Sequence, residues 1–159
     1  MKFFGKKVEK VNEEVIVIPR GDGEDLVFKA RAVIDFEPFE QICPSPKPPT
    51  VIRPGEKTFS PDFSDPAYIA AVTQNQGRRM AWLVIESLKA TEGLEWETVD
   101  YAKPETWEGY SKELKESNIT DIEINKILSG VMSANCLNED RVQEARMRFL
   151  ASQKAPSSS

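Results

Sequence analysis

A long helix over residues 65–90 has to be enclosed by the rest of this chain. Asp65 is a typical N-cap, and Pro66 suits the first helical position, where its missing N–H costs nothing. The run MAWLVI at residues 80–85 is apolar on every side of such a helix, so other elements must cover it. Gly93 suits the left-handed conformation that commonly ends a helix. We therefore expect the other elements to pack around this helix or to lead into it.

Two extended runs near the N-terminus predict a β-hairpin. Residues 14–20 and 25–36 contain β-branched residues and partly alternating apolar residues. The segment Gly21-Asp22-Gly23 between them supplies the turn, because glycine tolerates positive φ. A two-stranded hairpin is marginal by itself, so one of its faces should lie on the helices.

A proline-rich segment, residues 37–61, follows the hairpin. Its prolines disfavour a helix and interrupt a strand ladder, which predicts an extended strap with polyproline II character. A second interpretation is that the strap is a recognition ligand, because Pro46-Lys47-Pro48-Pro49 matches the PxxP pattern. Pro46, Pro48 and Pro49 are therefore candidate partner-binding residues. The apolar residues expected to anchor the strap are Phe36, Phe39, Ile42, Val51 and Ile52.

The chain after the long helix has the pattern of further helices. Pro104 suits the first turn of one helix. Thr120 and Glu123 have the spacing of a capping box, and a last helix should begin near Asn138. The residues expected to face the core are Trp107, Tyr110 and Leu114, then Ile124, Ile127, Leu128 and Val131, and finally Val142, Ala145 and Phe149.

These patterns predict an α+β fold with an N-terminal β-hairpin, a proline-rich strap and a mainly helical C-terminal bundle. The 159 residues are enough for one domain with a real core, so we expect a single domain over residues 1–152. Its parts would be the hairpin (1–36), the strap (37–61) and the helical part (62–152), and residues 153–159 would form a disordered tail. No apolar run reaches the roughly 20 residues that a membrane-spanning helix needs.

Residue chemistry does not point to catalysis. The chain has no histidine, which removes the commonest general base and the commonest zinc ligand. Cys43 and Cys136 lack the spacing of a zinc site, and a net charge of −5 argues against binding to a nucleic-acid backbone. Glu113-Leu114-Lys115 imitates the E-x-K motif of some magnesium-dependent nucleases, but the two charged side chains diverge on a helix. We therefore expect no enzyme and assign no catalytic, cofactor-binding or metal-ligating residue.

The middle of the long helix interrupts its apolar surface. Residues 73–79 (TQNQGRR) carry three side-chain amides and two guanidinium groups. One interpretation is that Arg78 and Arg79 contact a protein partner, because arginine is enriched at interfaces. The other interpretation is a solvent-exposed belt with a slight bend at Gly77.

Short motifs follow one another in a distinctive order along nearly the whole chain. They are Ile18-Pro19 before a glycine turn, Val27-Phe28-Lys29-Ala30, the Pro-x-Pro-x-Pro-Pro run, an Asp-Pro-x-Tyr helix with Trp82-Leu83-Val84-Ile85, Trp96-x-x-Val99, Pro104-x-Thr106-Trp107, Glu123-Ile124-x-x-Ile127, Asn135, and Ala145-x-x-x-Phe149-Leu150. This order resembles that of tail assembly chaperones of long-tailed (siphovirus-type) bacteriophages.

The resemblance implies a non-catalytic protein that binds the phage tape-measure protein and promotes assembly of the tail tube. It implies action in the cytoplasm of the infected bacterium and absence from the mature virion. In many such phages a ribosomal frameshift adds a domain that recruits the tail tube protein, which would be a second partner. We expect no nucleic-acid or membrane partner, and we leave open self-association of the chain.

Two other functions stay open at this point. One is a structural tail or connector subunit of the virion, which would assemble into rings or tubes. The other is a phage adaptor that binds a host protein through the proline strap, which would recognise a small domain with an aromatic groove.

Overall fold

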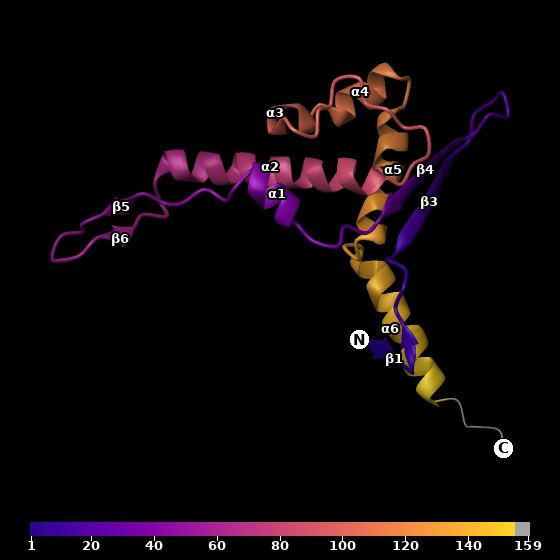
Figure 1. The fold of residues 1–159 in the computed structure, drawn as a ribbon, viewed down its shortest axis with the longest axis horizontal. Coiled ribbons are helices and arrows are strands. Elements are labelled where there is room, and N and C mark those ends of the chain that lie inside the picture. Colours follow the sequence, from indigo (N-terminus) through magenta and orange to yellow (C-terminus); the bar gives the residue numbers. More distant parts are fainter. Residues whose placement is uncertain (155–159) are drawn as a thin grey trace. The chain divides into compact units, whose positions relative to one another are not determined.

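The computed structural model describes residues 1–154 and has the predicted α+β composition (Figure 1). Short antiparallel hairpins lie in the N-terminal part of the sequence, and helices make up most of the C-terminal part. None of the described helices is both long and apolar enough to cross a membrane. The elements are β1 (Lys2–Phe3), β2 (Lys6–Lys7), β3 (Glu13–Ile18), β4 (Leu26–Arg31), α1 (Glu37–Ile42), β5 (Thr50–Val51), β6 (Ser60–Pro61), α2 (Pro66–Leu88), α3 (Pro104–Trp107), α4 (Tyr110–Glu116), α5 (Asp121–Ala134) and α6 (Glu139–Lys154).

The described chain folds as two compact units. Unit 1 contains residues 1–34, residues 86–95 and the described chain from residue 114 onward, and unit 2 contains residues 35–85 and 96–113. Helices α2 and α4 each contribute residues to both units. The division of residues 1–152 into one domain with three parts stays a prediction.

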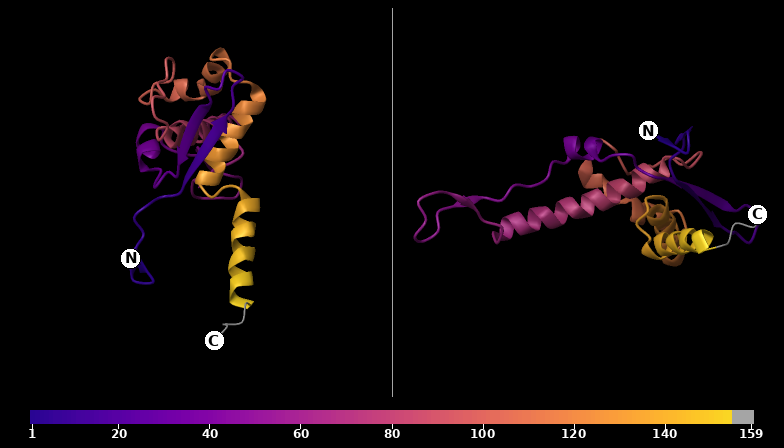
Figure 2. Two further views of the ribbon diagram at one scale, coloured as in Figure 1. Left: turned by 90° about the vertical axis from the view of Figure 1, so that its right-hand side faces the viewer. Right: turned by 90° about the horizontal axis from the view of Figure 1, so that it is seen from below.

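In unit 1, the β3–β4 hairpin packs one face on α5, as predicted (Figures 1 and 2). The antiparallel register places Ile16 opposite Phe28, and alternate side chains of both strands are buried. Strand β4 ends at Arg31, before the predicted end at Phe36, because the pairing stops after the Ala32 N–H donates to the Asn12 carbonyl. The Val33 N–H donates to the Asn135 side chain (2.8 Å) instead of to a strand.

Helix α5 begins with the predicted capping box. The Thr120 hydroxyl accepts from the Glu123 N–H (3.3 Å), and the Glu123 carboxylate accepts from the Thr120 N–H (2.8 Å). Ile127 and Val131 are fully buried along its core face. At its other end, the Asn12 side-chain amide donates to the carbonyls of Ser133 and Ala134. The helix is thus fixed at both ends by groups from within unit 1.

Helix α6 begins after Asn138 as predicted, but its packing prediction was wrong. Val142, Ala145 and Phe149 are exposed and do not point into a core. The spacing of the three residues describes one face of the helix, and burial of that face depends on what lies opposite it in space. The helix also includes residues 153–154 of the predicted tail, and residues 155–159 lie outside the described chain.

In unit 2, the long helix α2 has the predicted start and the predicted enclosed segment. The Asp65 carboxylate accepts from the Tyr68 N–H (2.8 Å), which is the expected N-cap bond. Residues 81–85 are buried, although the adjoining Met80 is exposed. The helix ends at Leu88, short of the predicted end at residue 90, so Gly93 does not cap it, although Gly93 has the expected left-handed φ of +74°.

The strap contains structure that its prolines did not predict. Helix α1 forms because Pro38 occupies its first turn, where a proline N–H is not needed. A short β5–β6 ladder pairs Val51 with Ser60 and Thr50 with Pro61. The expectation of neither helix nor ladder in this segment was therefore wrong. Among the expected anchors, Phe39 is buried, whereas Ile42 and Ile52 are exposed.

The predicted helix from Pro104 is divided into α3 and α4. The break lies at Glu108-Gly109, where the Gly109 N–H donates to the Thr106 carbonyl (3.0 Å). Glycine lowers the stability of a continuous helix at this point. Trp107 and Leu114 are nevertheless buried, as the apolar spacing predicted.

Candidate functional site

Part of the polar middle of α2 holds the strap in place within unit 2. The Asn75 side-chain amide donates to the carbonyls of Cys43 (3.2 Å) and Pro44 (3.4 Å). Pro46 and Pro48 are half-buried and Pro49 is exposed. The Pro49 carbonyl accepts from the Asp62 N–H (2.7 Å), so Pro49 leads directly into the β5–β6 hairpin. Two of the three candidate prolines are thus partly covered already.

Arg79 is engaged inside unit 2. Its Nη1 lies 2.7 Å from Glu40 Oε1, and its guanidinium group lies 4.0 Å from the centre of the Phe36 ring. Phe36 and Phe39 in turn pack on Trp82, with ring centres 5.4 and 5.8 Å apart. An arginine stacked on an aromatic ring and paired with a carboxylate stabilises its own fold. A substitution at Arg79 would therefore disturb α1 as well as any partner contact.

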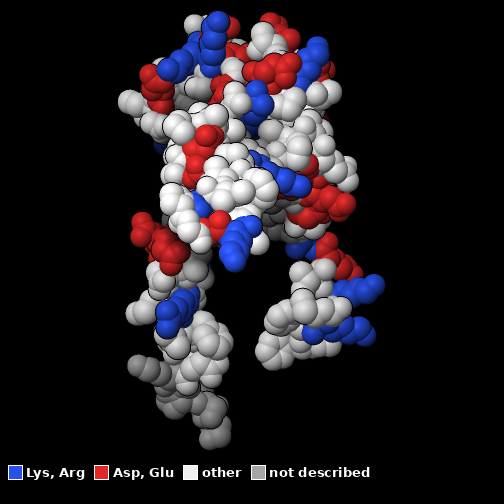
Figure 3. Space-filling model, turned by 90° about the vertical axis from the view of Figure 1, so that its left-hand side faces the viewer, with Lys and Arg blue, Asp and Glu red and all other residues white. Residues whose placement is uncertain are grey.

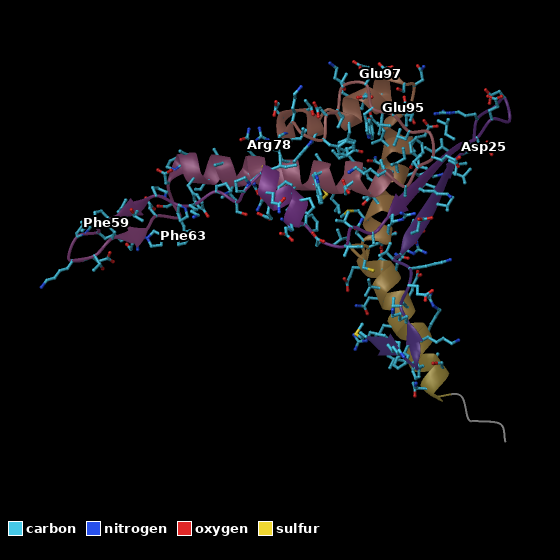
Figure 4. All side chains as sticks on the ribbon, in the orientation of Figure 1. Asp25, Phe59, Phe63, Arg78, Glu95 and Glu97 are labelled. Atoms are coloured by element: carbon cyan, nitrogen blue, oxygen red, sulfur yellow. The ribbon has the colours of Figure 1, made fainter. Side chains whose placement is uncertain are left out.

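Arg78 lies differently from its neighbour. It is half-exposed on α2 (Figure 4), and no ion pair or side-chain hydrogen bond involving it is observed among the described residues. Of the two candidate arginines, Arg78 is therefore the one whose guanidinium group remains available to a partner.

The largest exposed aromatic side chains of unit 2 lie on and beside the β5–β6 hairpin (Figure 4). Phe59 is 70% exposed and Phe63 is 62% exposed. Ile52, in the hairpin loop, and Ile69, in the first turns of α2, are also more than half exposed. We call these four residues the strap patch.

The hairpin that presents the strap patch is ordered by its own turn chemistry. Pro54 and Gly55 occupy the centre of a turn in which the Glu56 N–H donates to the Arg53 carbonyl (2.9 Å), and Gly55 has a φ of +89°. Positive φ at the third turn residue is typical of a type II turn and favours glycine. At the base of the hairpin, the Phe63 ring packs edge-on against Tyr68. The aromatic side chains are therefore held on a defined scaffold.

Uncharged and charged residues are both present on the face that Figure 3 shows. White surface, which includes polar uncharged residues, is interspersed there with Lys, Arg, Asp and Glu. The exposed apolar side chains of unit 2 described above are those of the strap patch, and exposed apolar area rimmed by polar groups is typical of a protein-binding surface. This surface can bury apolar side chains of a partner and offers polar contacts at its margin.

Helix α6 presents a second exposed apolar surface, in unit 1. Phe149 is 59% exposed, and Val142, Met147 and Leu150 are exposed as well. The Arg141–Glu14 ion pair links its first turn to β3. A helix of this length is marginal in water without a packing partner, so this element suits contact with another chain.

The E-x-K triplet has structural partners in the fold. Glu113 accepts hydrogen bonds from the backbone N–H groups of Glu97 and Thr98 and from the Thr98 hydroxyl. Burial raises the pKa of Glu113, but these hydrogen bonds outweigh it and hold the pKa below its usual value. Lys115 pairs with Asp121 (2.7 Å). Within residues 1–154, no cluster of three or more Cys, Asp or Glu side chains is arranged to hold a metal ion.

No sequence pattern singled out Phe59 and Phe63, although a local feature indicates the turn of their hairpin. The Pro54-Gly55 dipeptide is a strong turn former, and Ile52 and Phe59 lie on either side of it. This dipeptide inside the proline-rich segment predicts the turn of the hairpin, but it does not predict the exposure of the aromatic residues.

The chain was compared with protein-family models, with curated proteins and with solved structures, and none of the three comparisons found a match.

Proposed function

We propose that this chain is a non-catalytic tail assembly chaperone of a long-tailed bacteriophage, which binds the tape-measure protein and promotes tail tube assembly. The order of sequence motifs described above suggests this class. The observation that carries the proposal is the strap patch, where Phe59 and Phe63 expose most of their surface on an ordered hairpin. Such side chains lower solubility unless a partner covers them, which is what a chaperone for an apolar client requires.

The client in this proposal is a long helical protein that exposes apolar stripes before the tube surrounds it. Aromatic side chains supply large contact area at low entropic cost, because few rotamers are lost on binding. Many copies would bind along one client, each through its own strap patch. The work would take place in the cytoplasm of the infected bacterium, and the chaperone would leave before the virion is complete. A frameshifted extension that recruits tail tube protein belongs to the same proposal.

Co-expression with the tape-measure protein of the same phage tests this function. We expect a soluble complex that contains several chaperone copies per client. Replacement of Phe59 and Phe63 by serine should leave the client insoluble, whereas Ile122→Ser is the matched control. Ile122 is an exposed aliphatic residue on α5, in unit 1 and outside the strap patch.

Two measurements make the result decisive. Circular dichroism and thermal melting of the serine variant must match wild type, because Phe63 also contacts Tyr68. If the client stays insoluble beside the wild-type chaperone, and no complex is recovered by pull-down, the chaperone function is wrong. Rings or tubes formed by the chain alone would then favour the structural tail subunit.

A further inference from the structure

The two edges of the β3–β4 hairpin are not equivalent. The Ala32 N–H donates to the Asn12 carbonyl (2.8 Å), and the register continues this pairing through Glu14 with Ala30 and Ile16 with Phe28. In an antiparallel pair, hydrogen-bonded and non-hydrogen-bonded positions alternate. The backbone N–H and C=O groups of Glu13, Val15 and Val17 therefore point away from β4.

The outer edge of β4 is blocked at its middle position, Lys29, from within unit 1. The Thr91 hydroxyl accepts from the Lys29 N–H (2.9 Å) and donates to the Lys29 carbonyl (3.0 Å). No described residue makes a corresponding hydrogen bond to the outward backbone groups of β3. Unpaired backbone groups on a strand edge are a template for pairing with another strand.

The open edge of β3 is also apolar. Val15 is 57% exposed and Val17 is 48% exposed, and Val27 is exposed beside Val17 on β4. Glu13 is the charged residue at this edge, and its carboxylate forms an ion pair with Arg31 (3.0 Å). Pro19 occupies the next outward position, where it has no N–H to donate. The part of β3 that can pair with another strand is therefore limited to residues 13–17.

We propose that β3 pairs in antiparallel fashion with β3 of a second copy of this chain, with the two-fold axis at Val15. The resulting four-stranded sheet has the order β4-β3-β3-β4. This register places Val15 opposite the same residue of the second copy and Glu13 opposite Val17. No like charges then face each other across the new ladder, and the exposed valines of both copies form one apolar surface. The pairing does not depend on the proposed function.

A charge swap at the two-fold axis tests this register. Val15→Lys and Val15→Glu each place two like charges directly opposite each other, so each variant should dimerise roughly ten-fold more weakly than wild type. An equimolar mixture of the two variants should regain dimerisation, because lysine then faces glutamate. Ile122→Lys and Ile122→Glu are the matched controls on α5, and both should behave as wild type. Sedimentation velocity over a series of concentrations gives the dimer population.

Hydrogen exchange of the wild-type protein provides a test that needs no variant. The amide protons of Val15 and Val17 should become protected as concentration rises. Those of Glu14 and Ile16, which bond to β4, should be protected at every concentration.

Any of three results would overturn the pairing. The first is a wild-type chain that stays monomeric up to millimolar concentration, which would show that β3 does not pair with a second copy. The second is unchanged dimerisation of the Val15 variants. The third is a mixture that dimerises no better than either variant alone.

Discussion

The Thr91 hydroxyl bonds twice to the backbone of Lys29, as acceptor from its N–H and as donor to its carbonyl. One side chain from the segment after α2 therefore satisfies both backbone groups that β4 presents at this point. The β3 edge has no such partner among the described residues. This difference between the two edges is the basis of the proposed self-pairing.

Thr91→Val should lower the free energy of unfolding by about 1–3 kcal/mol, because it removes both hydrogen bonds and leaves the Lys29 backbone groups unpaired. Thr73→Val is the matched control. Its hydroxyl bonds to the Ile69 carbonyl (3.0 Å) on an exposed side of α2, so its loss should change stability little. Urea midpoints measure both changes, and equal effects would contradict the role given to Thr91.

Asn135 connects the end of α5 to two other segments of unit 1. Its Oδ1 accepts from the Val33 N–H (2.8 Å), and its Nδ2 donates to the fully buried Ser87 hydroxyl (2.9 Å) and the Val131 carbonyl (2.8 Å). Asn135→Ala should cost about 2–3 kcal/mol, because buried polar groups lose their partners. Asn138→Ala removes two long contacts of 3.4 Å, one to the Ser133 hydroxyl and one from the Arg141 N–H, and should cost less. Denaturant unfolding measures both losses of stability. A larger loss for Asn138→Ala than for Asn135→Ala would contradict the role given to the Asn135 hydrogen bonds.

Gly130 allows β3 to approach α5 closely. A Cβ at this position would lie 2.3 Å from Ile16 Cγ1, which is too close for two carbon atoms. Gly130→Ala should therefore destabilise the protein by about 1–2 kcal/mol, although alanine gains about 1 kcal/mol in helix propensity. Ile16→Ala should remove the clash, so a double-mutant cycle should show that the two changes are not additive. Additive effects would mean that the two residues do not contact each other.

The ionised Glu123 carboxylate should stabilise the fold only above acidic pH. The hydrogen bond from the Thr120 N–H lowers its pKa, and the nearby Arg20 guanidinium group lowers it further. Because the folded-state pKa is below the unfolded value of about 4.3, this contribution is present above that value. It is lost as pH falls through the folded-state pKa. The difference in stability between wild type and Glu123→Gln should shrink from pH 7 toward pH 3, and a constant difference would exclude this origin.

Local chemistry made several elements predictable from the sequence. The capping box at Thr120, the N-cap at Asp65 and the glycine turn before β4 each depend on residues within a few positions of one another. The enclosed segment of α2 was predictable because apolar residues on every side of a helix must be buried.

Features that depend on distant contacts were not predictable in this way. Helix α1 forms where prolines disfavoured a helix, and it packs through Phe39 on Trp82 and Trp107. The stripe of α6 has the spacing of a core face, but exposure depends on what lies opposite it in space. The periodicity of apolar residues shows which residues share a face of a helix, but it does not show which element packs against that face.

The surroundings of the candidate partner-binding residues also depend on distant contacts and were not predictable from the sequence. Partner contact was one of two interpretations of Arg79, and the sequence did not predict that the Phe36 ring and the Glu40 carboxylate contact its guanidinium group. Phe59 has no local pattern that marks it as exposed, and its position follows from the β5–β6 pairing.

The affinity of the purified chain for a soluble fragment of the tape-measure protein tests the proposed function most directly. We predict that wild type binds at several positions along the fragment. Phe59→Ser combined with Phe63→Ser should weaken each site roughly 30-fold or more, as expected for loss of aromatic hot spots. Equal affinity of wild type and the double variant would contradict the role of the strap patch, and the absence of any binding by wild type would contradict the proposed function itself.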